Sequence, residues 1–284
     1  MLINALSDPV NRILVIGPHP DDCEFSCGRL IMRRKGQNTF VICMTDGRKG
    51  QEGTPGKIIP ENEYAKLRIK ESTKALGEFH VDLNNIFFFN LPDQGIVANP
   101  YVIDKLAMIF RKIKPDFILI PPWEGAHPDH DACHLFSIVA TKNLGFNPSN
   151  IIEYGSYNNY QGSFRVQEFI PSDKEEFKLK PSPNEQERWN NIMKVFKSQL
   201  NQQKYYIPKS KFEVFRQVPM YDYSKLPYGA KQSEIIRDLL SPIYPIARKL
   251  IPKKDKLFYE TWKSNINPNE INKKLDSYVK EYKL

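Results

Sequence analysis

RILVIGPHPDDCEFSCG, residues 12–28, begins as a short apolar run and then becomes abruptly polar. The run is typical of a buried β-strand, and the prolines and paired aspartates after it cannot continue that strand. Adjacent carboxylates repel each other and are costly to desolvate, so packing alone gives no reason to place them there. The stretch is therefore either a hydrated acidic turn or a place where a cation binds.

Similar apolar runs recur along the first half of the chain and alternate with segments of helical periodicity. Near-continuously apolar strands separated by helices indicate a parallel sheet covered on both faces. We therefore expect an α/β fold with a Rossmann-like, mostly parallel sheet. The expected strands are residues 12–17, 39–45, 85–91 and 116–122, and the expected helices are residues 61–77 and 99–114.

The second half of the chain has a more mixed pattern. Residues 151–157 and 165–170 resemble strands, residues 184–200 resemble a helix, and residues 203–230 are rich in Tyr and Pro and predict irregular structure. The expected organisation is one domain, residues 1–230, followed by a C-terminal extension, residues 231–284.

The charge of the chain is concentrated in that extension. The formal net charge is +8, and residues 231–284 hold 12 Lys and Arg against 7 Asp and Glu. The remainder is near balance, which disfavours a general nucleic-acid-binding function. A basic, partly amphipathic extension predicts contact with an anionic surface, and the alternative is a solvated tail.

Two features predict a cytoplasmic protein. The N-terminal segment lacks the charged start, apolar stretch and cleavage site of a signal peptide. The four cysteines form no CxxC pair and are interpreted as reduced thiols. Cys23, Cys27 and Cys133 lie near the polar motifs, but we interpret them as small buried apolar residues.

Polar residues follow two of the expected strands. His19 and Asp22 are three residues apart after the first, and HPDH, residues 127–130, follows the run at 116–122. Because sites in parallel sheets collect at the carboxyl ends of strands, the two motifs are expected to be neighbours. Two imidazoles and one carboxylate, His19, Asp22 and His130, would form a hydrolytic zinc site with room for water.

The other residues of the two motifs then have expected roles. Asp21 can act as general base, and His127 as an acid or as a stabiliser of an oxyanion. Asp129 could hold the His127 imidazole in one tautomer. His134, one turn after His130, could be a further ligand, but a helix-surface position is the preferred interpretation.

In these motifs the chain resembles the LmbE-like, or PIG-L-type, N-acetylglucosaminyl de-N-acetylases. The resemblance covers roughly residues 10–215 and includes PHPDD at 18–22, TDGRKG at 45–50, LRIKES at 67–72, LPDQG at 91–95 and HPDH at 127–130.

The resemblance implies the same zinc ligands, Asp21 as general base and His127 in protonated form beside the oxyanion or the leaving amine. It adds Arg68 and Asp93 as sugar-binding residues. Arg68 could instead pair with Glu71 or an aspartate on a solvated helix face, and Asp93 could only stabilise a turn. Cys23 and Gln94 depart from the usual family residues, which affects substrate details.

The predicted function is therefore hydrolysis of the acetamide of an N-acetylhexosamine unit in a small glycoconjugate. Zinc or another divalent metal is the expected cofactor, and acetate and a free amine are the expected products. The alternatives are a metal-dependent hydrolase of another amide or ester and a non-catalytic sugar-binding module. A dinucleotide-binding enzyme is disfavoured because the first strand–helix turn lacks GxGxxG.

Overall fold

The first apolar run forms an interior strand of the main sheet. The computed structural model describes residues 2–34, 36–51, 58–96, 99, 101–223 and 227–229. Strand β1 (Ile13–Gly17) is buried along its whole length and pairs in parallel with β2 (Thr39–Thr45) and β4 (Phe117–Ile120). Burial on both faces explains why this strand is apolar at every position rather than at every second one.

The main sheet has seven strands in the order β3-β2-β1-β4-β5-β9-β8. The flanking strands β3 (Ile86–Leu91) and β5 (Ile151–Tyr154) are parallel to the central three. Strands β9 (Glu213–Gln217) and β8 (Phe177–Leu179) are antiparallel additions at one edge. The predicted α/β fold with a mostly parallel sheet is confirmed.

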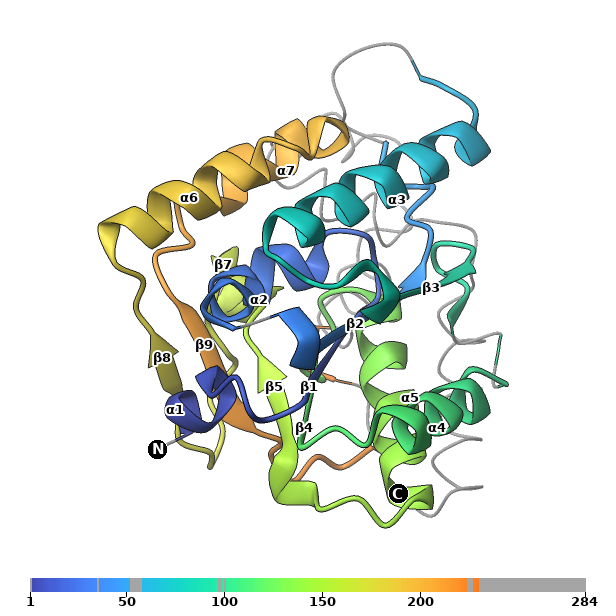
Figure 1. The fold of residues 1–284 in the computed structure, drawn as a ribbon, viewed down its shortest axis with the longest axis vertical. Coiled ribbons are helices and arrows are strands. Elements are labelled where there is room, and N and C mark those ends of the chain that lie inside the picture. The colour runs from blue at the N-terminus through green and yellow to red at the C-terminus, as the bar shows by residue number, and fades with distance from the viewer. Residues whose placement is uncertain are drawn as a thin grey trace, which may run out of the picture.

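Helices cover both faces of this sheet (Figure 1). Leu14 and Ile16 of β1 belong to the core cluster that includes residues of α4 (Tyr101–Ile113) and α5 (Pro128–Asn143). Ile13 and Val15 point the other way, into a second core cluster. That cluster includes residues of α1 (Leu2–Ser7), α2 (Asp22–Arg33), α3 (Glu61–Glu78), α6 (Pro183–Met193) and α7 (Leu200–Tyr206).

The second half of the chain differs from expectation in three places. The predicted helix 184–200 ends at Met193, and a 3-10 turn (Lys197–Gln199) separates it from α7. The prediction of irregular structure for residues 203–230 is wrong at β9, which joins the main sheet. Of the predicted strand 165–170, only β7 (Arg165–Val166) forms, and it pairs with β6 (Tyr157–Asn158) in a separate small sheet.

The order of the strands creates a switch point between β1 and β4. The chain runs from β1 outward through β2 to β3 and then returns to the other side of β1 as β4. The connections therefore leave β1 and β4 in opposite directions, which opens a crevice at their carboxyl ends. The two polar motifs follow these two strands.

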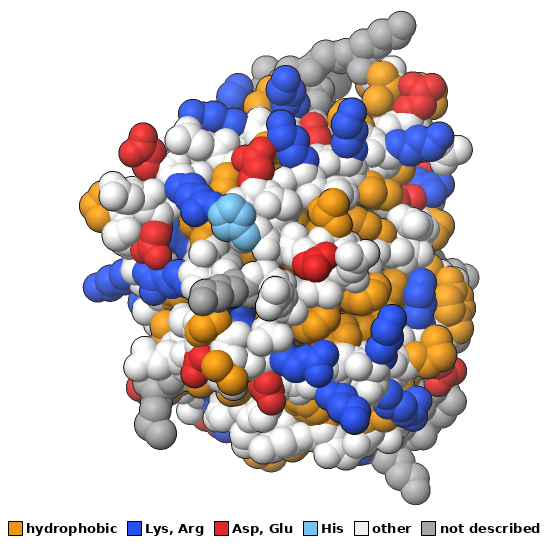
Figure 2. Space-filling model, in the orientation of Figure 1, with side chains coloured by type: hydrophobic (Ala, Val, Ile, Leu, Met, Phe, Trp, Pro, Cys, Tyr) orange, Lys and Arg blue, Asp and Glu red, His pale blue; other side chains and the backbone are white. Residues whose placement is uncertain are grey.

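The surface of the described part carries mixed charge. On the face shown in Figure 2, Lys and Arg side chains are spread among Asp, Glu and apolar side chains. Among the helices of the described residues, none is long and apolar enough to cross a membrane. The predicted extension, residues 231–284, lies outside the described residues.

Candidate metal centre and active site

The loop after β1 turns sharply into α2 at the two aspartates. Asp22 is the first residue of α2, and its Oδ2 accepts a hydrogen bond from the His19 backbone N–H at 2.9 Å. Asp21 has φ 152° and ψ −25°, a region that side chains other than glycine rarely occupy. Such strain persists only where the surroundings impose it, and it concentrates at functional sites.

His19, Asp22 and His130 meet at the switch point. Their candidate ligand atoms all lie within 4.8 Å of one another. His19 Nδ1 is 3.0 Å from one carboxylate oxygen of Asp22, and His130 Nε2 is 3.5 Å from the other. The sequence prediction that these two motifs are neighbours is correct.

This donor set fits a divalent metal. His130 Nε2 is buried and has no hydrogen-bond partner, although a buried imidazole nitrogen normally has one. Two imidazoles and one carboxylate are the ligands of many catalytic zinc sites. Burial lowers the pKa of His130 to about 4, so its ring is neutral at pH 7 and can donate a lone pair.

Two further carboxylates lie on the opposite edge of the His19 ring. His19 Nε2 is 3.3 Å from Asp93 Oδ1 and 3.3 Å from Asp129 Oδ2. Burial lowers the pKa of His19, but Asp93, Asp129 and Asp22 together raise it well above its ordinary value. Carboxylates on the far nitrogen of a metal-binding histidine fix the orientation of its ring.

His127 is the N-cap of α5, and its Nδ1 accepts a hydrogen bond from the Asp129 backbone N–H at 3.1 Å. Asp129 thus contacts His127 through its main chain, whereas we expected its carboxylate to do so. Because Nδ1 is an acceptor, the neutral ring carries its hydrogen on Nε2. Burial and the nearby His19 lower the pKa of His127 to about 4, so the ring is neutral at pH 7. We had expected it to be protonated.

Arg68 of α3 is buried and lies against the general-base candidate. Its Nη2 is 2.7 Å from Asp21 Oδ2 and also donates to Pro20 O, while Nη1 donates to Gly47 O. The alternative of a solvated helix face is wrong for Arg68. Burial raises the pKa of Asp21 to about 7, although the charge of Arg68 opposes that rise.

His134 and the cysteines are not among the grouped ligand candidates His19, Asp22 and His130, which we call the metal cluster. His134 is fully buried, so the predicted helix-surface position is wrong; its ring nitrogens contact Pro121 O at 2.9 Å and Tyr223 Oη at 2.8 Å. The prediction of buried, unpaired thiols is confirmed for Cys23, Cys27 and Cys133.

Sequence reasoning missed one aromatic residue at the site. The ring of Tyr157 lies edge-on to the His130 ring, with 5.2 Å between centroids. Tyr157 is on β6, 27 residues after His130, and no local pattern in the sequence singles it out.

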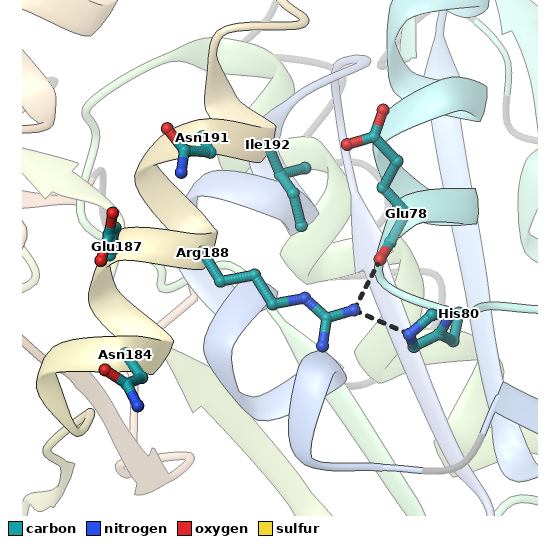
Figure 3. A pocket seen from close by; sticks show the side chains of 7 residues that line it. All are labelled: Glu78, His80, Asn184, Glu187, Arg188, Asn191 and Ile192. Carbon is teal, nitrogen blue, oxygen red and sulfur yellow. Dashed lines mark hydrogen bonds between the residues drawn. The ribbon is translucent and has the colours of Figure 1, made fainter.

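A separate pocket of about 560 Å³ lies between the end of α3 and α6 (Figure 3). Arg188 points across it and donates to Glu78 O and to His80 Nε2. It is lined by none of the residues of the metal cluster.

The comparison with known families agrees with this geometry. Residues 14–141 match the PIG-L family, described as GlcNAc-PI de-N-acetylase. The matched segment is 128 of the 284 residues of the chain. The match begins in β1 and ends in α5, so it contains both motifs of the metal cluster.

Two relatives of the PIG-L domain are named as deacetylases. Diacetylchitobiose deacetylase of Thermococcus kodakarensis is 30% identical over 162 residues, which are 53% of this chain and 57% of that protein. A probable N-acetyl-alpha-D-glucosaminyl L-malate deacetylase 2 of Bacillus subtilis is 32% identical over 127 residues, 43% of this chain and 57% of that protein. The match thus covers less than two thirds of either relative.

The fold is shared more widely. The crystal structure of GalB, the 4-carboxy-2-hydroxymuconate hydratase of Pseudomonas putida KT2440, superposes with a TM-score of 0.58 at 15% identity. The match covers 74% of this chain and 97% of that one. At this identity it shows the fold alone, and the chemistry must be argued from the site.

Proposed function

We propose that this protein is a metal-dependent de-N-acetylase that hydrolyses the acetamide of an N-acetylhexosamine unit in a small glycoconjugate. The observation that carries the proposal is the meeting of His19, Asp22 and His130 beside a strained, partly buried Asp21. The family of the domain and the names of its two relatives support the same reaction.

His19, Asp22 and His130 would hold the ion, with zinc as the best fit to two nitrogens and one oxygen. When bound, such an ion supplies Lewis acidity, which polarises an amide carbonyl and lowers the pKa of water. Asp93 and Asp129 keep the His19 ring in place.

The residues of the chain provide the proton transfers. Asp21, with a pKa of about 7, takes a proton from the attacking water and returns it to the leaving nitrogen. The Nε2–H of His127 donates a hydrogen bond to the carbonyl oxygen, which becomes negative when water attacks the carbonyl carbon. One water is consumed, and acetate and a free amine are released.

Arg68 and Asp93 were predicted to bind the sugar. Arg68 is only 4% exposed, and its guanidinium contacts Asp21 and two backbone carbonyls, so we assign it to positioning Asp21. Asp93 keeps its predicted sugar-binding role within the proposal, with one oxygen beside His19 and the other accepting from Lys49 N–H.

The proposal retains the cytoplasm as the location of the protein, and it retains contact of residues 231–284 with an anionic surface.

The test of the reaction is mass spectrometry of a panel of N-acetyl sugars and other N-acylated or esterified compounds after incubation with the metal-loaded protein. Loss of one acetyl group from the N-acetyl sugars supports the proposal. Hydrolysis only of other amides or esters favours the first alternative, and sugar binding without turnover favours the second.

A further inference from the structure

The hairpin of β6 and β7 is anchored to the loop that carries His127. The Asn158 side chain donates one hydrogen bond to Glu124 Oε2 at 3.0 Å and another to Glu168 O at 2.8 Å. Glu124 lies in the loop between β4 and His127. The position of the hairpin relative to the metal cluster is therefore fixed by buried polar contacts.

Tyr157, the residue before Asn158, lies between this hairpin and the metal cluster. Its ring meets the His130 ring edge-on at an interplanar angle of 65°. The ring of Phe164, which is 37% exposed, packs near it, with 5.9 Å between centroids. Tyr157 thus forms a wall of the site and is itself only partly buried.

The Tyr157 hydroxyl makes no hydrogen bond to any residue that the structure describes, unlike other tyrosines of the interior. Tyr154 Oη donates to Ile16 O at 2.9 Å, and Tyr206 Oη accepts from Gln167 Nε2 at 3.0 Å. A tyrosine at an interface between apolar and wet surroundings normally uses its hydroxyl for a polar partner. Beside the metal cluster, that partner can be a ligand.

The hydroxyl can serve as a hydrogen-bond donor. An ordinary tyrosine has a pKa of about 10, so the phenol carries its proton at neutral pH. A donor suits the oxygen-rich surface of an N-acetyl sugar, and the ring offers apolar area beside it.

We propose that Tyr157 is a further substrate-contacting residue, whose hydroxyl donates a hydrogen bond to the bound N-acetyl sugar. The inference rests on the proposed function and deepens it, because it assigns recognition to a hairpin that follows the matched family region. It also makes the hairpin, through its attachment to Glu124, part of the substrate site.

The test compares Tyr157→Phe with Tyr160→Phe in the full chain loaded with zinc. Tyr160 lies on the same hairpin, with its ring against Tyr228, so its variant removes an identical hydroxyl three residues away. Acetate release from N,N'-diacetylchitobiose gives kcat and KM, and elemental analysis gives the zinc content. We expect Tyr157→Phe to lower kcat/KM about tenfold with unchanged zinc, and Tyr160→Phe to stay within about twofold.

Three results would overturn the inference. One is a Tyr157→Phe variant whose kcat/KM matches that of the wild type; another is an equal loss in both variants. The third is loss of zinc from Tyr157→Phe, which would mean that the residue acts only by supporting His130. In all three the wild type still releases acetate. A wild type that releases none refutes the proposed function, and this inference with it.

Discussion

Replacing Arg68 by Met should shift the pH dependence of the reaction upward. Arg68 Nη2 and Asp21 Oδ2 are 2.7 Å apart, and the guanidinium is buried. At an effective dielectric constant of about 20, opposite charges at that distance attract by about 6 kcal/mol. Asp21 can relax after the substitution, so we expect the smaller change usual for a contact pair, a rise in the Asp21 pKa of about 1 to 3 units.

The direction of the effect follows from the form of Asp21 that reacts. Asp21 must be ionised to accept a proton, so the rate of the wild type rises with pH through the pKa of this carboxyl group. Loss of the positive charge raises that pKa, and the ascending limb of the variant moves to higher pH. At a pH below both values, kcat/KM should fall by about 10- to 1,000-fold, and it should recover as the pH is raised.

The assay is a pH series of kcat/KM for acetate release, with Arg68→Lys as the matched control. Lys keeps the charge but not the planar contacts, so its ascending limb should move less than that of Arg68→Met. A loss of activity in Arg68→Met that is equal at every pH would refute the reasoning. It would instead support the original prediction that Arg68 binds the sugar.

Three further outcomes are expected. His130→Ala should lose most of the roughly one divalent ion per chain, whereas His134→Ala should keep it, as measured by elemental analysis; equal retention in both would contradict the ligand set. Asp21→Asn should keep the ion while turnover falls at least ~100-fold, and near-normal kcat would show that Asp21 is not the base. The full chain should sediment with anionic liposomes at low salt and dissociate at high salt, while a chain ending at Gly229 should stay in the supernatant. An insoluble or inactive shortened chain would mean that residues 231–284 belong to the fold.

The parallel half of the sheet could be predicted because its signals are local. β1, β2 and β4 are largely apolar and buried, β3 is largely apolar and partly buried, and the two polar motifs follow β1 and β4. Because sites in parallel sheets lie at the carboxyl ends of the strands, the sequence predicts that His19 and His130 lie close together. The position of each motif after an expected strand was enough for this prediction.

β9 was not predicted because the partners of its charged residues are brought close only in the folded chain. Residues 203–230 were predicted to be irregular because of their Tyr and Pro content, yet the charged Glu213 and Arg216 of β9 are almost fully buried. Glu213 accepts from the backbone N–H of Arg29, and Arg216 pairs with Glu153. Since these partners lie more than 60 residues away, no window of sequence around β9 can reveal them.

The same explanation holds for the details of the site. The contact of Arg68 with Asp21 joins α3 to the loop after β1, and that of Asp129 with His127 depends on the backbone geometry of one helix cap. The motifs identified residues that meet at the switch point. Their partners, protonation states and hydrogen-bond directions depended on burial, which the motifs do not encode.

Under the proposed function, the placement of the ligand set after β1 and β4 would link metal concentration to thermal stability. In an unfolded chain His130 is more than 100 residues from His19 and Asp22, so an ion could not reach all three without a large loss of chain entropy. An ion that binds only the native state at 100 times its Kd adds about 2.7 kcal/mol to the free energy of unfolding. The melting temperature should therefore rise with added zinc and fall with a chelator, so a melting curve reports occupancy of the site without any substrate.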